Sequence, residues 1–261
     1  MKKLVLFLFI ATSFNVAVHS QNYNYDVNGD GVITSADVTA IYDYLLGNSP
    51  SIDETVYTVY GVTFKMIKVE HGTVAADNEN PQEITLTYDY YIGETEVTQA
   101  LWIAVMGTNP SYYNNGNYGH DLNRPVERVS WNDCQTFINN LNAITGKTFR
   151  LLTDAEWEYA ARGGNLSHGY MYAGSNSVDD VAWYSGNSSS QTHTVASKTS
   201  NELGLFDMSG NVQEWVQNGS GDYRYLRGGG YSSSAESCII SRSTAMLKTD
   251  YVKYVGLRIA L

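Results

Sequence analysis

The chain has 261 residues, of which 43% are hydrophobic, and a formal net charge of -11. This length suits one medium-sized domain with a small additional segment, and the apolar content is sufficient for a buried core. The acidic excess argues against a nucleic-acid-binding protein, because contacts to phosphate groups need a basic face.

The N-terminus has the pattern of a secretory signal peptide. Lys2 and Lys3 precede a mostly apolar stretch over residues 4–18, and small or tolerated residues lead to a cleavage point before Gln21. The apolar run is too short to cross a bilayer, and no other stretch is apolar enough to do so. We therefore predict a signal peptide over residues 1–20, export to the periplasm or the extracellular space, and no membrane span.

The segment DVNGDGVITSAD, residues 26–37, has the spacing of an EF-hand calcium loop. Oxygen-bearing groups alternate along it, and Gly31 stands at the sixth position, where such a loop turns sharply. A hard cation with many oxygen ligands needs this alternation. The predicted calcium ligands are Asp26, Asn28, Asp30, Val32 (through its carbonyl), Thr34 and Asp37.

This loop and the helical apolar spacing of VTAIYDYLLG after it resemble a dockerin-type repeat. In that family Asp, here Asp37, closes the loop where EF-hands have Glu. The resemblance implies calcium binding by residues 21–48 and a cohesin-like partner. Dockerins of cellulosomes carry two repeats and this chain shows one, which speaks against such a partner. The polar residues 49–56 are predicted to be a linker.

Residues 57–261 form the main predicted domain. Apolar and polar residues alternate in GVTFKMIKVEHG (61–72) and EITLTYDYYIG (83–93), which predicts a strand in each. Capping residues and terminal glycines predict helices over 98–107, 130–146 and 153–163. In the third of these, Thr153 and Glu156 have the spacing of a capping box. The 23 glycines indicate long irregular loops between the elements.

Ordered motifs in this domain resemble the sulfatase-modifying-factor family, which is named for the formylglycine-generating enzyme. They read ETEVTQALW, NPS, RPVERVSWNDC, RLLTDAEWEYAARGG, AWYSGNS, NELGLFDMSGNVQEWV, LRGG and GLRIAL. The resemblance covers residues 57–261. It implies an α+β fold of the C-type-lectin-like kind, with little regular secondary structure, preceded here by the small helical calcium-loop segment.

The family resemblance also implies a structural calcium ion in FDMSGNVQEW. Carried onto this sequence, its ligands are the side chains of Asp207 and Glu214 and the carbonyls of Gly210 and Val212. The alternative is that Asp207 caps a turn and Glu214 pairs with an arginine such as Arg227. A second family calcium site is not predicted, because its Asn is absent before Trp183.

The family enzyme binds Cu(I) with two cysteine thiolates that follow its RGG motif. In this sequence those positions are Ser233 and Cys238, so one thiolate is missing. A serine hydroxyl is a hard ligand that stays protonated near neutral pH and cannot replace a thiolate at Cu(I). Cys238 is therefore a poor candidate catalytic residue, copper is not expected, and whether the protein is an enzyme stays open.

The chain contains two cysteines. In an exported protein such a pair usually forms a disulfide, which predicts a Cys134–Cys238 bridge. The alternative is two buried free thiols, since cysteine is often a small core residue.

The segment between the RGG and GLR motifs is rich in Ser, Thr and Tyr, side chains that make adaptable contact surfaces. An ordinary core strand with a loop is an equal alternative reading of it. We expect an exported calcium-binding protein that binds a protein or glycan at this C-terminal surface. The alternative is a formylglycine-generating oxidoreductase acting on a sulfatase cysteine.

Overall fold

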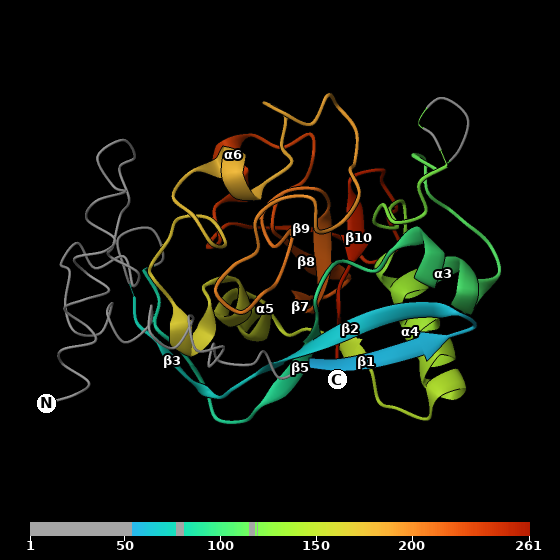
Figure 1. Ribbon diagram of the computed structural model, residues 1–261, viewed down its shortest axis with the longest axis horizontal. Coiled ribbons are helices and arrows are strands. Elements are labelled where there is room, and N and C mark those ends of the chain that lie inside the picture. Colours follow the sequence, from blue (N-terminus) through green and yellow to red (C-terminus); the bar gives the residue numbers. More distant parts are fainter. Residues whose placement is uncertain (1–53, 77–80, 115–117, 119) are drawn as a thin grey trace, which may run out of the picture. The chain divides into compact units, whose positions relative to one another are not determined.

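The computed structural model describes residues 54–261 except 77–80, 115–117 and 119 (Figure 1). The predicted signal peptide and calcium loop lie outside these residues, as does most of the predicted linker. The first described strand begins at Glu54, within the last residues of the predicted linker. Residues 54–56 alternate between exposed and half-buried positions because they pair with the neighbouring strand.

The strands form two larger sheets and one hairpin within the described residues. The first sheet has the order β1-β2-β5-β11-β6, and the second has the order β10-β7-β8-β9. Strands β3 and β4 pair only with each other. Their bounds are β1 Glu54–Val59, β2 Val62–Val69, β3 Gly72–Val74, β4 Ile84–Leu86, β5 Tyr90–Gly93, β6 Arg150–Leu151, β7 Gln213–Ser220, β8 Tyr223–Arg227, β9 Ser243–Leu247, β10 Val255–Leu257 and β11 Ile259–Ala260.

The predicted strand over 61–72 is confirmed as β2, and its hairpin to β1 turns through Tyr60 and Gly61. Both residues have positive φ, 47° and 84°, as a two-residue type I′ turn requires. The predicted strand over 83–93 is instead divided into β4 and β5. The chain bends between them, where the Asp89 carboxylate accepts a hydrogen bond from the backbone of His71 at 2.8 Å.

The three predicted helices are confirmed as α3 (Gln99–Met106), α4 (Trp131–Thr145) and α5 (Asp154–Ala161). Thr153 and Glu156 form the expected capping box at α5. Ser130 and Asp133 form a second box at α4 that the sequence reading did not anticipate. The described chain also contains the short helix α6 (Val178–Val181) and the 3₁₀ turns η1 (Gly164–Leu166) and η2 (Ala235–Cys238). Long loops join these elements, as the family fold implies.

The strands supply residues alternately to two apolar cores. In β2, Met66 belongs to the core that contains α3 and α4, whereas Ile67 belongs to the core around α5. Trp215 and Val216 of β7 divide in the same way. Successive side chains of a strand point to opposite faces, so both faces of the strands are buried. In the first core the rings of Trp102 and Phe137 stack at a centroid distance of 4.9 Å.

No helix in the described part of the chain is long and apolar enough to cross a membrane.

Candidate functional site

The loop after β8 packs directly on Cys238. Gly228 and Gly229 both have positive φ, 88° and 69°. A Cβ atom at Gly229 would lie 2.7 Å from the Cys238 Sγ and 2.8 Å from the Ser237 carbonyl oxygen. A side chain has no room there, so this glycine is required for the loop to cover the thiol.

Ser233, at the position predicted for the missing thiolate, holds a tight turn. Its Oγ accepts a hydrogen bond from the Gly230 backbone N–H at 2.9 Å, and its own N–H donates to the Gly230 carbonyl at 2.8 Å. The Ser233 carbonyl in turn accepts from the N–H of Ser185. The hydroxyl therefore has a structural partner of its own in the turn.

Cys238 is the last residue of η2 and is completely buried. It belongs to a small apolar cluster with Tyr172, Val181 and Ile239. Burial raises the pKa of its thiol to about 12. Near neutral pH the side chain is thus a protonated thiol, which is neither a nucleophile nor a Cu(I) ligand of the thiolate kind.

The predicted Cys134–Cys238 disulfide is not present in the structure, where both cysteines are free and buried. Cys134 lies in the core of α3 and α4, whereas Cys238 lies in its own small cluster. Burial also raises the pKa of Cys134 well above its usual value, with Asp133 adding to the effect. Each thiol is enclosed by separate apolar neighbours, which corresponds to the alternative of two buried free thiols.

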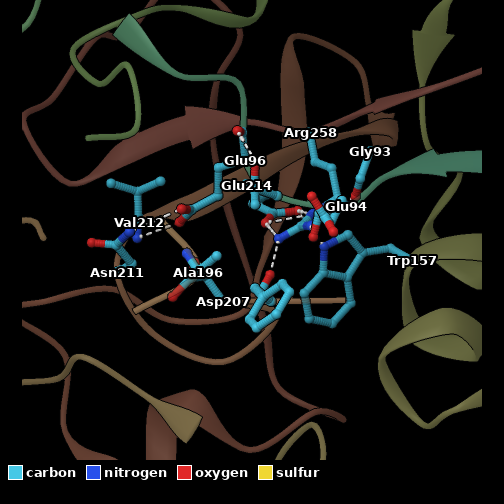
Figure 2. A network of polar contacts seen from close by, with 12 residues as sticks. Gly93, Glu94, Glu96, Trp157, Ala196, Asp207, Asn211, Val212, Glu214 and Arg258 are labelled. Atoms are coloured by element: carbon cyan, nitrogen blue, oxygen red, sulfur yellow. Dashed lines mark hydrogen bonds and ion pairs between the residues drawn. The ribbon is translucent and has the colours of Figure 1, made fainter. Parts of the chain in front are cut away.

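A second notable region is a buried charge network around Arg258 (Figure 2). Arg258 lies between β10 and β11 and is completely buried. Its Nη2 is 2.8 Å from the Glu214 Oε1, and its Nε is 3.0 Å from the same atom. The remaining guanidinium hydrogens reach the backbone carbonyls of Gly93, Glu94 and Phe206. The arginine thereby ties Glu214 to two other segments of the chain, residues 93–94 and Phe206.

Glu214 has both of its oxygens engaged. Besides Arg258, its Oε2 accepts a hydrogen bond from the Trp157 Nε1 at 2.7 Å. This agrees with the alternative in which Glu214 pairs with an arginine, although the partner is Arg258. Arg227 instead pairs with Asp154 at 2.6 Å and with Glu158 at 3.0 Å.

Two further buried carboxyl groups belong to the network. Glu96 accepts hydrogen bonds from the Val212 N–H and the Asn211 side chain, at 3.1 and 2.9 Å. Asp207 Oδ2 accepts from the Ala196 N–H at 2.7 Å. Burial raises the pKa of Asp207 to about 6, and burial together with the charges of Asp207 and Glu214 raises the pKa of Glu96 well above its usual range. One guanidinium thus faces three carboxyl groups.

The predicted calcium ligands of this region fit an ion only in part. Asp207 Oδ1 is buried without a hydrogen-bond partner and is available to a cation. Glu214, however, is saturated by Arg258 and Trp157, and a guanidinium at 2.8 Å opposes a divalent ion on the same carboxylate. The Gly210 N–H donates to the Gly228 carbonyl and the Val212 N–H to Glu96, which fixes the loop that carries the two predicted carbonyl ligands. Within the described residues no three His, Cys, Asp or Glu side chains are grouped to hold a metal.

One known family profile matches this domain over its full described length. The profile of the sulfatase-modifying factor enzyme 1-like domain covers residues 54–261. The chain belongs to the sulfatase-modifying factor enzyme 1-like family. The profile of the dockerin type I domain matches residues 24–61, so a dockerin segment precedes the family domain.

Relatives with curated descriptions include proteins of different activity. The chaperone protein LppX of Paenibacillus barcinonensis is 35% identical, over 75% of this chain and 84% of that protein. An inactive C-alpha-formylglycine-generating enzyme 2 of Bos taurus is 33% identical, over 44% of this chain and 41% of its own length. A formylglycine-generating enzyme of Streptomyces coelicolor is also 33% identical, over 44% of this chain and 45% of its own length. The matched part is less than half of either enzyme.

Among solved structures, Treponema denticola variable protein 1 superimposes with a TM-score of 0.72 at 30% identity. The alignment covers 80% of this chain and 98% of that protein. The formylglycine-generating-enzyme-like fold, with its mixed helix and strand content, is therefore established for the domain.

Sequence reasoning missed Glu96, Arg258 and Trp157 as members of the buried network. All three stood within the motifs that carried the family resemblance. The available signal was a charged residue within an apolar run, as in GLRIAL, because a charge at such a position needs a buried partner.

Proposed function

We propose that this chain is an exported calcium-binding protein whose family domain binds a protein or glycan at its C-terminal surface and does not generate formylglycine. The observation that carries the proposal is the state of the two residues at the expected copper positions. Ser233 is committed to a turn, and the thiol of Cys238 is sealed beneath Gly229 with a raised pKa. Formylglycine chemistry at copper needs two accessible thiolates, and this arrangement supplies none.

The C-terminal surface has the composition of a contact surface. Between the glycine loop and β10, the side chains of Ser232, Ser234, Thr249 and Tyr251 are exposed, and Tyr251 is 59% exposed. Tyrosine gives a large amphipathic contact area at a small entropic cost, and hydroxyl groups adapt their hydrogen bonds to a partner. The description of LppX as a chaperone supports a binding role for a domain of this family.

The remaining parts of the proposal rest on the N-terminal sequence. The dockerin segment supports calcium binding by Asp26, Asn28, Asp30, Val32, Thr34 and Asp37. It also supports an extracellular or periplasmic location and leaves a cohesin-like partner as a candidate. The signal-peptide pattern of residues 1–20 is consistent with export.

An aldehyde assay tests the loss of enzymatic activity. The mature protein is incubated with Cu(I), oxygen, a thiol reductant and a cysteine peptide of the sulfatase type, and the aldehyde is detected by mass spectrometry. Ser233→Cys, which restores the pair of cysteines, serves as the matched variant. We expect no aldehyde from either protein, because Cys238 stays buried in both. Aldehyde formation by the unaltered protein would overturn the proposal.

A further inference from the structure

A surface cavity of about 290 Å³ opens beside η2, between the glycine loop and the edge strand β9. Leu226 and Gly229 are buried at its base, and Gln213 is half-buried. The other lining residues are exposed at its rim. The full lining consists of Gln213, Leu226, Gly229, Glu236, Ser237, Arg242, Ser243 and Thr244. Cys238 is not part of it.

Rigid elements hold this lining in place. Thr244 pairs with Leu226, and Ser243 with Arg227, in the register of β8 and β9. Ser237 lies within η2, where its N–H donates to the Ser234 carbonyl at 3.0 Å. Sites built on strands and capped turns hold their polar groups more precisely than sites on free loops.

Several polar groups of the cavity are available to a ligand. The side chains of Gln213, Ser243 and Thr244 have no hydrogen-bond partner among the described residues. Glu236 and Arg242 form an ion pair of 2.9 Å at the rim, with exposed fractions of 74% and 57%. The cavity thus presents an amide, two free hydroxyls, a carboxylate and a guanidinium.

The charge and polarity of the lining favour one class of ligand. Glu236 and Arg242 neutralise each other, so the cavity offers no net charge to an acidic or a basic ligand. Leu226 is its only large apolar residue, which is too little for an apolar molecule. A pyranose ring carries neighbouring hydroxyls that donate and accept at once, and carboxylate, guanidinium and amide groups each engage such pairs in a bidentate manner.

We propose that this cavity binds a neutral sugar residue of a glycan, with Gln213, Glu236, Arg242 and Thr244 as its hydrogen-bonding groups. The inference rests on the proposed binding function and names the class of ligand for it. The ion pair stays closed in the bound state, so that each of its members contacts a sugar hydroxyl with its free atoms. The open rim leaves the rest of the glycan chain in solvent.

The test is binding of the mature full-length protein to an array of neutral, sialylated, sulfated and uronic-acid glycans. Titration with the best neutral sugar in free form follows. We expect retention on neutral glycans and a loss of affinity of about tenfold or more in Arg242→Gln and Gln213→Ala, the scale of one or two hydrogen bonds that include a charged donor. Thr244→Ala should weaken binding several-fold. The matched control Thr108→Ala, an exposed threonine after α3 and outside the cavity and the C-terminal surface, should keep the affinity unchanged.

Three results would overturn the inference: no retention of any neutral glycan, retention of acidic glycans only, or equal affinity in Arg242→Gln and the unaltered protein. The aldehyde assay separates this failure from that of the proposed function. A blank array with no aldehyde removes only the sugar site, whereas aldehyde formation removes the binding-module proposal itself.

Discussion

The ion pair between Arg258 and Glu214 gives the sharpest test of how this domain is held together. Both side chains are at most 1% exposed, and Arg258 also donates to three backbone carbonyls from distant segments. Replacing Arg258 with Met keeps an unbranched side chain in place of the arginine stem and removes the charge and all of the donors. Glu214 is then left with Trp157, beside two other buried carboxyl groups.

Breaking a buried ion pair by removing one partner costs about 3–5 kcal/mol, because the remaining charge is buried without compensation. With a urea dependence of about 2 kcal/mol per M for a domain of this size, the unfolding midpoint of Arg258→Met should fall by roughly 2 M. Urea titration followed by tryptophan fluorescence measures this change. Trp157 and Trp215 are completely buried and report on both cores.

Arg242→Met is the matched control, because it breaks an ion pair of similar length at the surface. Exposed pairs contribute at most about 1 kcal/mol, so its midpoint should hardly move. In a double-mutant cycle, Glu214→Gln combined with Arg258→Met should cost less than the sum of the two single changes. Equal midpoints for Arg258→Met and Arg242→Met would refute the reasoning that the buried network holds the domain together.

Three further predictions concern other parts of the chain. Burial raises the pKa of Glu127 from 4.5 to about 7, so the folded state holds a proton that the unfolded state releases between these values. As the pH rises from about 4.5 to 7.5, the free energy of unfolding of the unaltered protein should therefore fall by up to about 3 kcal/mol relative to that of Glu127→Gln. Urea unfolding at several pH values measures this difference, and a difference that does not change with pH would contradict the prediction. Gly229→Ala should destabilise the domain by about 2–4 kcal/mol, since its Cβ would lie 2.7 Å from the Cys238 Sγ. Gly221→Ala is the control, because Gly221 also has positive φ but open space around it, and it should cost about 1–2 kcal/mol. Thermal unfolding measures both changes. Calorimetric titration of the mature protein with calcium should give one bound ion per chain, and this binding should be lost in Asp30→Ala and retained in Asp207→Ala. A second bound ion that depends on Asp207 would contradict this, and would show that Glu214 exchanges Arg258 for the metal.

Local signals explain why the helices were predictable. Thr98 and Thr153 cap α3 and α5, and Gly107 ends α3 in the left-handed conformation that glycine favours. These contacts lie within a few residues of sequence, so the sequence contains all of their parts. The division of the predicted strand over 83–93 was not predictable in this way, because it depends on the Asp89 carboxylate accepting a hydrogen bond from the backbone of His71, 18 residues away in the sequence.

The cysteines show the limit of composition as evidence. The number of cysteines and the expected export favoured a disulfide, but a bridge also needs the two Cβ atoms to face each other. The structure instead gives Cys134 and Cys238 separate apolar surroundings. The sequence could not decide which arginine pairs with Glu214 for the same reason. One alternative named an arginine such as Arg227, and only the packing of the folded chain selects Arg258.

The sequence by itself determined the family, the order of the helices, the dockerin segment and the serine at residue 233, where the family resemblance places a copper-binding thiolate. Each of these depends on residue identity or on spacing within one segment. Only the tertiary structure decided that Cys238 is sealed beneath Gly229, that one arginine faces three buried carboxyl groups, and that eight residues of the C-terminal region line a polar cavity. Burial, pKa and cavity shape arise from segments far apart in the chain, because they depend on which surfaces meet when it folds.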